Sequence, residues 1–244
     1  MERQRVEFRD LGRMDYKKAW DYQELLLHEN VQKKSVATVA SVGLHELPVA
    51  DPGTTHYLLF VEHPSVYTLG KSGKMEHVLI NEEDRKNKGI AFFHTNRGGD
   101  ITFHGEGQVV GYPILDLEKF YTDIGRYLRD LEEVIIRTLA EYGIAAGRSA
   151  GETGVWIDAL EKGKERKICA MGVRCSRWIT MHGFALNVNT NLDYFSHIIP
   201  CGIQHKKVTS IREELGREVN MEEVKERLKK NFCSVFNAEL FPLP

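Results

Sequence analysis

The sequence predicts an α+β fold, in which a mixed, largely antiparallel sheet is covered by packed helices. Short apolar segments follow one another in hairpin-like succession, and amphipathic helical segments occur between them at intervals rather than in strict alternation. The chain has 244 residues, 42% of them hydrophobic, which is enough for a substantial core. Because no internal repeat or linker divides the chain, we expect one domain, residues 1–244.

The first half of the chain predicts several strands and one helix. Residues 15–30 are amphipathic with helical spacing, and Asp15 is the expected N-cap. The charged residues 71–90 predict a loop that could fold over a site. We expect extended segments at 5–11, 57–61, 66–70 and 91–117. A glycine-rich turn interrupts the last of these.

The second half contains the longest helical pattern, residues 118–144, which Gly143 is expected to end. Its apolar stripe consists of Ile124, Leu128, Leu131, Ile135 and Leu139. The remaining pattern predicts a hairpin of 154–160 with 166–178, a strand at 181–190 and an amphipathic helix at 221–240.

Composition argues against several classes of protein. The formal net charge of -2 lacks the basic excess typical of nucleic-acid binding. No apolar run approaches the roughly 18 residues that a membrane span needs. The start, MERQRVEFRDLGRM, has no apolar core of a secretory signal and contains acidic residues. We therefore expect a cytoplasmic protein with no nucleic-acid or membrane partner.

The four cysteines include no CxxC pair, which argues against a structural zinc site. Cys169, Cys175 and Cys233 lie in apolar strand or helix patterns and are interpreted as core residues. Cys201 lies between Pro200 and Gly202, outside any regular pattern. It is either a nucleophile presented by a turn or a turn cysteine packed under its apolar neighbours.

A cysteine nucleophile needs help to ionise, because a free thiol has a pKa of about 8.5. The sequence offers several cations or bases for this purpose: His104, His182, His197, His205 and Lys167. Lys167 opens the apolar segment KICAMGV. An outward lysine there would only mark the sheet edge, whereas an inward amine could take the thiol proton.

The stretch RGGDITFHGEGQ, residues 97–108, combines glycines with one histidine. In an extended segment Thr102 and His104 share one face, and Ile101 and Phe103 share the other. The stretch is either a glycine-rich hairpin with a structural histidine or a substrate cradle in which amides and His104 approach a carbonyl. The phosphate-binding patterns GxxxxGK[ST] and GxGxxG are absent.

Longer motifs resemble one known family. RGGDITFHGEGQVVGYPILDL resembles the signature of the octanoyl-[acyl-carrier-protein]:protein octanoyltransferases (LipB) of lipoate biosynthesis. LGRMDYKKAWDYQ, EHPSVYTLGK and KICAMGVRCSRWITMHGFALNVNTNLDYFSHIIPCGI resemble further landmarks of that family, in the same order. The chain departs from the family at Glu106, where HGPGQ is usual.

The resemblance implies the catalytic fold of biotin and lipoate protein ligases and transfer of an octanoyl group from acyl carrier protein. Implied acceptors are lysines of the lipoyl domains of 2-oxoacid dehydrogenases and of the glycine cleavage H protein. Cys201 matches the residue that forms the acyl-thioester, and Lys167 matches its activator and acid-base. No cofactor, nucleotide or metal is implied, because the donor thioester is already activated. The matching substrate-binding positions are Arg97, Gly98, Gly99, Asp100, Ile101, Thr102, Phe103, His104, Ala170, Met171, Gly172, Gly183, Phe184 and Ala185.

Two other functions remain as alternatives. An ATP-dependent lipoate ligase would share the fold, but PCGI and the lack of an evident nucleotide-binding loop argue against it. A non-catalytic acyl-binding module would not need Cys201 and Lys167 together. The lysines near the C-terminus, Lys225, Lys229 and Lys230, either dock the acidic carrier protein or form an ordinary solvated helix face.

Overall fold

The computed structural model describes residues 3–41, 53–199 and 207–242, with side chains of the first segment described to Val36. Within these residues a nine-stranded sheet has the order β12-β1-β2-β6-β10-β9-β8-β7, and β11 pairs with β9. Its strands are β1 (Gln4–Arg13), β2 (His56–Glu62), β6 (Gln108–Ile114), β7 (Ala146–Gly147), β8 (Val155–Ile157), β9 (Arg166–Ser176), β10 (Ile179–Asn187), β11 (Lys207–Val208) and β12 (Ala238–Pro242).

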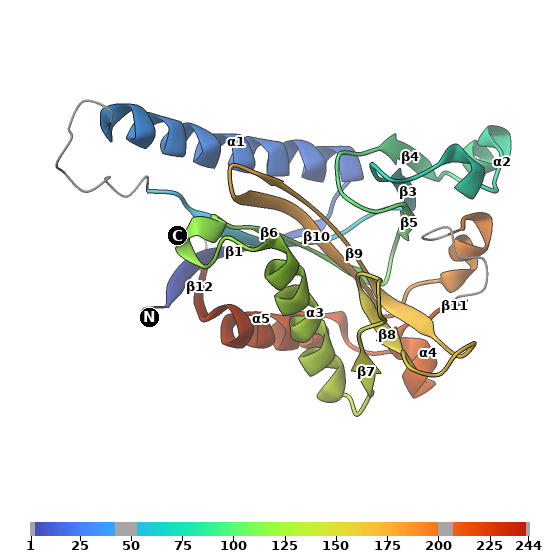
Figure 1. The fold of residues 1–244 in the computed structure, drawn as a ribbon. Helices are drawn as coiled ribbons and strands as arrows, with labels where there is room; N and C mark the ends of the chain where they lie inside the picture. The colour runs from blue at the N-terminus through green and yellow to red at the C-terminus, as the bar shows by residue number, and fades with distance from the viewer. Residues whose placement is uncertain (1–2, 42–52, 200–206, 243–244) are drawn as a thin grey trace.

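The strand directions confirm the expected mixed, largely antiparallel sheet. Every neighbouring pair of the main sheet is antiparallel except β12 with β1, β1 with β2, and β11 with β9. A smaller sheet has the order β4-β3-β5 and consists of β3 (Val66–Leu69), β4 (Ala91–His94) and β5 (Ile101–His104). It lies beside the N-terminal end of α1 (Tyr16–Ser41) (Figure 1).

Helices cover both faces of the main sheet. The long helix α1 runs across one face, and α3 (Ile124–Ala140) and α5 (Met221–Phe236) lie on the other (Figure 1). The shorter segments are η1 (Met75–His77), α2 (Glu82–Asn87), η2 (Leu117–Lys119), η3 (Leu192–His197) and α4 (Ile211–Leu215). Among the described residues, no helix is both long and apolar enough to cross a bilayer.

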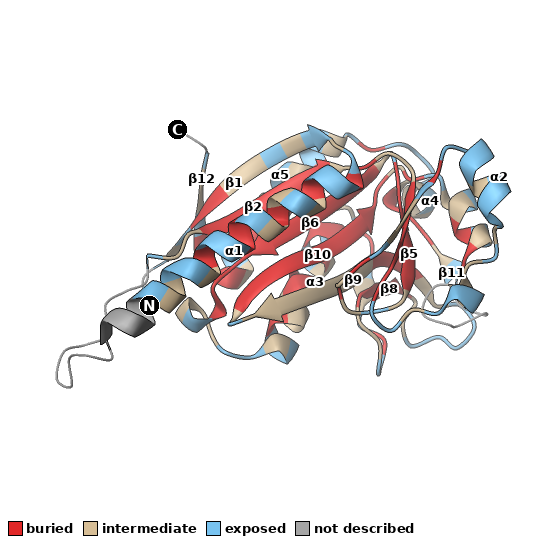
Figure 2. Ribbon diagram, turned by 90° about the horizontal axis from the view of Figure 1, so that it is seen from above, coloured by how far each residue is buried: buried red, intermediate tan, exposed pale blue. Residues whose placement is uncertain are grey.

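Alternation along the strands divides the core into two layers. In β2, Leu58 and Phe60 pack among the residues of α3 and α5, whereas Tyr57, Leu59 and Val61 pack against α1. The central strands β2, β6 and β10 are buried along most of their length, while the outer side of α1 is exposed (Figure 2). Packed side chains thus cover both faces of the sheet, as expected for a close-packed protein interior.

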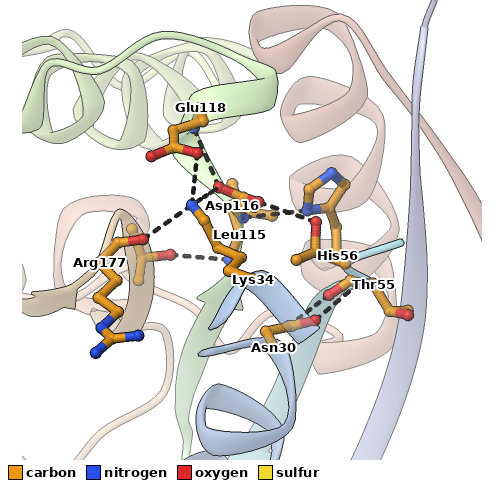
Figure 3. Close-up of polar contacts among 10 residues, drawn as sticks. Asn30, Lys34, Thr55, His56, Leu115, Asp116, Glu118 and Arg177 are labelled. Atoms are coloured by element: carbon orange, nitrogen blue, oxygen red, sulfur yellow. Dashed lines mark hydrogen bonds and ion pairs between the residues drawn. The ribbon is translucent and has the colours of Figure 1, made fainter. Parts of the chain in front are cut away.

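The far half of α1 is fastened by one buried cation. Lys34 Nζ lies 2.9 Å from Asp116 Oδ1, 2.8 Å from Glu118 Oε2 and 2.9 Å from the carbonyl oxygen of Arg177 (Figure 3). Three acceptors satisfy the three donors of the ammonium, which offsets the cost of burying it. This arrangement ties α1 to the segment after β6 and to the turn between β9 and β10.

Several helix limits differ from the expectation. The first helix begins at Tyr16 as predicted but extends to Ser41, well beyond residue 30. The long helix begins at Ile124 rather than 118, because the Asp123 side chain accepts from the Arg126 N–H and fixes the start there. Part of the expected loop 71–90 is helical, since α2 forms behind its N-cap Asn81.

The expected helix 221–240 is wrong at its C-terminal end. Asn237 adopts a left-handed conformation with φ 48° and ends α5 at Phe236. The residues that follow form β12, which pairs with β1 in parallel and completes the edge of the sheet. The lysines on α5 are engaged in ion pairs, which favours the solvated-face interpretation. Lys225, Lys229 and Lys230 pair with Asp10, Glu226 and Glu141, respectively.

Candidate active site

A cavity of about 730 Å³ opens among the 97–100 turn, β5, β6, β9 and β10. Lys167 lines it, and so does every expected substrate-binding residue except Phe103. Polar residues that the sequence analysis did not assign to substrate binding also line it, among them Tyr16, Gln108, Tyr112, His182 and Asn187. Gln108 ends the glycine-rich stretch and His182 precedes the expected Gly183. Their positions beside these motifs are the sequence signal by which the two residues could have been found.

The glycines of the 97–100 turn allow it to lie directly on β9. Gly98 N–H donates to Val173 O at 2.9 Å, and a Cβ on Gly172 would lie 2.5 Å from Gly98 O. Gly99 has a φ of +85°, which favours glycine. The amide of Gly98 is therefore used by the sheet, which corrects the expectation that it faces a ligand.

The two glycines after His104 do not line the cavity. A Cβ on Gly107 would lie 2.6 Å from the backbone of Asn189, and one on Gly105 would lie 2.4 Å from the ring of Phe103. Gly107 thus permits close packing against the segment after β10, and Gly105 permits close packing against the Phe103 ring. Glu106 lies between them and pairs with Arg13 on the surface, where both side chains are more than half exposed.

Arg97 holds the turn together from within. Its Nη2 donates to the carbonyl oxygen of Thr68 at 2.5 Å and to that of Asp100 at 2.8 Å, and its Nη1 donates to Gly98 O at 3.0 Å. The side chain lines the cavity although the residue is buried. Its charge therefore contributes a positive potential to the cavity while its donors position the turn.

The alternation expected for β5 is largely confirmed. Thr102 and His104 line the cavity, whereas Phe103 stacks on Tyr194 with ring centroids 4.5 Å apart. Ile101 also lines the cavity, although it belongs to the same small core cluster as Phe103. Phe103 is thus a packing residue, and it is the one expected substrate-binding residue that the structure turns away.

His104 is held neutral and fixed on both sides. Burial lowers its pKa well below the ordinary value, and the positive potential of neighbouring groups adds to the effect. Its Nδ1 lies 2.9 Å from Gln108 Oε1, so Nδ1–H donates, and its ring stacks on Tyr16 with centroids 5.7 Å apart. Nε2 lies 3.3 Å from the Thr68 hydroxyl, so both ring nitrogens contact polar side chains.

A buried hydrogen-bond chain connects His104 to the strand that carries Lys167. Gln108 Nε2 donates to Asn187 Oδ1 at 2.9 Å, and Asn187 Nδ2 donates to the carbonyl oxygen of Thr209 at 3.0 Å. The N–H of Thr209 in turn donates to the carbonyl oxygen of Lys167 at 2.9 Å. These bonds fix β5, β6, β10 and β9 relative to one another around the cavity.

Lys167 points inward, so the sheet-edge interpretation is wrong. The residue is 8% exposed, lines the cavity and places Nζ 4.5 Å from the centre of the Trp156 ring. Its neighbour Arg166 forms ion pairs with Asp158 and Glu214, which anchor the start of β9. The contact with the indole face holds Nζ in a fixed position at the cavity wall.

The loop before β8 is pinned beside Lys167 by Glu132. This carboxylate accepts from the Gly154 N–H at 2.9 Å and from Arg148 Nε at 3.0 Å, and it pairs with Arg129. Burial raises the pKa of Glu132, whereas these partners act in the opposite direction. Residues 151–153, which line the cavity, are thereby held close to the lysine.

Cys201 and His205 lie outside the described residues. The described chain on either side reaches residues of the cavity. Ile199 N–H donates to the carbonyl oxygen of His77 at 2.9 Å, and His77 lines the cavity. On the other side β11 forms backbone pairs with the start of β9, where Lys207 lies opposite Arg166, the neighbour of Lys167.

The three described cysteines differ in burial. Cys169 is fully buried in the main core, as expected, while Cys175 and Cys233 are only partly buried. Burial raises the pKa of each of the three thiols, so all three remain protonated at neutral pH. None of them lines the cavity.

Comparison with known proteins places this fold. Residues 15–233 match the family model of the lipoyl protein ligase A/B catalytic domain. The chain belongs to this family. An octanoyltransferase of Christiangramia forsetii is 58% identical over 236 residues, 96% of this chain and 97% of the relative. One of Solibacter usitatus is 47% identical over 96% of this chain and 94% of its own. The octanoyltransferase resemblance of the sequence motifs is confirmed.

Solved structures of lipoate protein ligases show the same fold at low identity. A bi-partite lipoate protein ligase of Thermoplasma acidophilum matches with a TM-score of 0.65 and 17% identity, covering 100% of this chain and 88% of that one. Lipoate-protein ligase A bound with ATP matches with a TM-score of 0.65 and 16% identity, covering 100% and 90%. The expected ligase-type catalytic fold is thus confirmed.

Proposed function

We propose that this chain is an octanoyltransferase of lipoate synthesis that moves an octanoyl group from acyl carrier protein to a lysine of a lipoyl domain through a thioester on Cys201. The carrying observation is near full-length similarity to octanoyltransferases, up to 58% identity, in a chain whose matching motifs surround one cavity. The acceptors we propose are the lipoyl domains of 2-oxoacid dehydrogenases and the glycine cleavage H protein. We also propose a single cytoplasmic catalytic domain.

The first half-reaction is thiol exchange. The Cys201 thiolate attacks the carbonyl carbon of the octanoyl thioester, and the carrier thiolate leaves and takes a proton. The Lys167 amine is the proposed acceptor of the cysteine proton and its donor to the leaving thiolate. Two observations support this role. Lys167 lines the cavity, and its neighbour Arg166 lies opposite Lys207 of β11, the strand that follows the segment of Cys201.

The second half-reaction transfers the octanoyl group to nitrogen. A lysine amine of the lipoyl domain attacks the Cys201 thioester, the carbon–sulfur bond breaks, and an amide forms. The attacking amine loses a proton, and Lys167 is the proposed intermediary that returns it to the cysteine sulfur. No further cofactor enters this balance, since the energy of the donor thioester drives both exchanges.

The cavity fits an acyl chain beside a polar reacting end. Ile124 and Leu128 of α3, Met171 of β9 and Phe184 of β10 give it an apolar wall. Its volume of about 730 Å³ is in the usual range for a small-molecule site. Each buried methylene would contribute about 0.8 kcal/mol, so the wall alone discriminates modestly between neighbouring chain lengths.

One experiment separates the candidate functions. Octanoyl-acyl carrier protein is mixed with the enzyme and a lipoyl domain without ATP, and the mass of the lipoyl domain is measured. We expect an octanoyl increment, and the Cys201→Ser variant should not produce it. An increment obtained only from free octanoate and ATP would instead indicate a ligase. Acyl binding without any increment would indicate a non-catalytic module.

A further inference from the structure

The buried side of α3 carries a carboxylate in line with two residues of the cavity wall. Ile124, Leu128 and Glu132 are spaced four residues apart and lie on one side of the helix. The first two line the cavity, whereas Glu132, one turn further on, is fully buried. Burial raises the pKa of Glu132 although its arginine partners oppose the shift, so a carboxylate here costs free energy. Apolar residues often replace such buried ion pairs without loss of stability, so core packing alone gives no reason for this one.

The two oxygens of Glu132 have different partners. Oε1 accepts from the Gly154 N–H at 2.9 Å. Oε2 lies 3.0 Å from Arg148 Nε and 2.8 Å from Arg129 Nη1. One oxygen thus holds the backbone just before β8, while the other is held by two cations. A side chain with a single oxygen would satisfy only one of these two sides.

Gly154 packs in turn against the strand that carries Lys167. Its φ of +114° lies in the region that favours glycine. A Cβ on Gly154 would lie 2.5 Å from the carbonyl oxygen of Cys169 and 3.5 Å from Lys167 Cε. The backbone that Glu132 holds is therefore in place beside the stem of the lysine.

The residues directly after Gly154 hold the lysine amine. Trp156 lies opposite Lys167 in the β8–β9 ladder, and the centre of its ring is 4.5 Å from Nζ. Because Gly154 precedes Trp156 by two residues, a shift of this segment disturbs the contact with the stem and the contact with the amine together. A displacement of about 1 Å from the productive geometry is enough to slow catalysis about 100-fold.

We propose that Glu132 is a positioning residue for acyl transfer, which fixes the Lys167 amine at the cavity by holding Gly154. Glu132 does not itself line the cavity, so it acts through these contacts. The inference rests on the proposed octanoyl transfer, in which the Lys167 amine accepts and returns the proton. Loss of the Glu132 carboxylate should therefore slow the chemical steps more than it weakens substrate binding.

Glu132→Gln tests the proposal with a side chain of nearly the same shape. Its single oxygen is expected to face the two arginine cations, which leaves the amide NH2 against the Gly154 N–H. For transfer from octanoyl-acyl carrier protein to a lipoyl domain, we expect kcat to fall about tenfold while KM stays within about twofold. The pH midpoint of Cys201 labelling by iodoacetamide should rise, because a more distant amine favours the thiolate less.

Glu133→Gln is the matched control. Glu133 is the next residue of α3 and shares the partner Arg148, with Oε2 2.8 Å from Nη2. Its other partner is Arg137 rather than the Gly154 N–H, and its side chain is 31% exposed. This variant loses a partly exposed ion pair, so kcat and KM should stay within about twofold and the labelling midpoint should not move.

Thermal unfolding checks that each variant is folded at the assay temperature. Should Glu132→Gln be unfolded, Gly154→Ala displaces the same segment from its other partner, the Cys169 carbonyl, and should give the same fall in kcat. Unchanged kcat and labelling midpoint in the folded variant would overturn the positioning role. An equal loss in Glu133→Gln would also overturn it. A wild-type enzyme that transfers no octanoyl group would instead contradict the proposed function.

Discussion

The imidazole Nδ1 of His77 lies 2.6 Å from the carboxylate Oδ2 of Asp100. Asp100 Oδ1 also accepts from the Ile101 N–H at 2.7 Å, so both carboxylate oxygens are engaged. The carbonyl oxygen of His77 accepts from the N–H of Ile199, which lies two residues before Cys201. Asp100 thus connects the glycine turn to the chain that leads to the proposed nucleophile.

Removing this charge should slow acylation without unfolding the protein. Asp100→Asn loses a charge-assisted hydrogen bond, which is worth about 1.5–3 kcal/mol in typical cases. If half of that loss reaches the transition state, kcat/KM falls roughly three- to thirteenfold. The value of kcat/KM is measured from reactions with octanoyl-acyl carrier protein that are stopped at successive times. Glu106→Pro, at an exposed ion pair, is the control and should remain within about twofold. Equal rates in Asp100→Asn and wild type would refute the positioning role.

The contact between Gly98 and Gly172 should tolerate no side chain. A Cβ at Gly172 would lie 2.5 Å from a backbone oxygen, so Gly172→Ala must lift the turn off β9. We expect acylation to fall at least tenfold, together with a lower melting temperature. Gly147→Ala is the matched control, because its nearest neighbour is a Cβ at 3.8 Å. Comparable activity of the two variants would show that the close approach is not required.

The sequence predicted some of the features behind these two predictions but not others. The glycine-rich stretch and the inward face of Thr102 and His104 followed from composition and alternation. The partner of Gly98 did not, because a backbone contact with β9 depends on tertiary packing. Likewise the left-handed backbone of His182 reverses its direction, which no regular period predicts.

The elements show the same division. The apolar spacing within residues 15–30, β2 and the β8–β9 hairpin made these parts predictable, whereas the second half of α1, which lacks such spacing, was missed. The last strand was missed because residues 238–242 continue a helix-like pattern, and only Asn237 marks the change. The polar chain through Gln108 and Asn187 was missed for a related reason. Single amides carry no periodic signal, and their roles appear only when β6 and β10 are adjacent.

Stability should decrease in mild acid because three buried histidines stay neutral in the fold. Burial lowers the pKa of His63 to about 4, that of His182 to about 3, and that of His104 well below 6.5. Unfolded histidines bind protons near pH 6.5, so this stabilisation is complete above that pH and is lost as the pH falls toward about 4. Each histidine contributes a slope of up to about 1.4 kcal/mol per pH unit.

His63→Gln isolates one of these contributions. Nδ1 of His63 donates to the carbonyl oxygen of Met14, and Nε2 accepts from the Tyr112 hydroxyl. Glutamine does not titrate, so the free energy of unfolding should depend less steeply on pH between 6 and 4, by about 1.4 kcal/mol per unit. Urea titrations at several pH values measure it. Parallel curves for the variant and wild type would contradict the assignment.

Loss of the Lys167 amine should slow alkylation of Cys201. Lys167→Met keeps an unbranched stem against Trp156 but removes the proton acceptor. We expect slower iodoacetamide labelling at neutral pH and a higher pH midpoint of the rate. The three described thiols are held protonated by burial, so labelling near neutrality should report Cys201, with Cys201→Ser as the blank. An unchanged profile would exclude Lys167 as the activator.

The covalent intermediate is the central claim, and intact mass spectrometry tests it most directly. The enzyme is mixed with octanoyl-acyl carrier protein in the absence of ATP and of any lipoyl domain. The account predicts an octanoyl mass on the enzyme that hydroxylamine removes and that Cys201→Ser lacks. A Cys201→Ser enzyme that still octanoylates a lipoyl domain at the wild-type rate would contradict it.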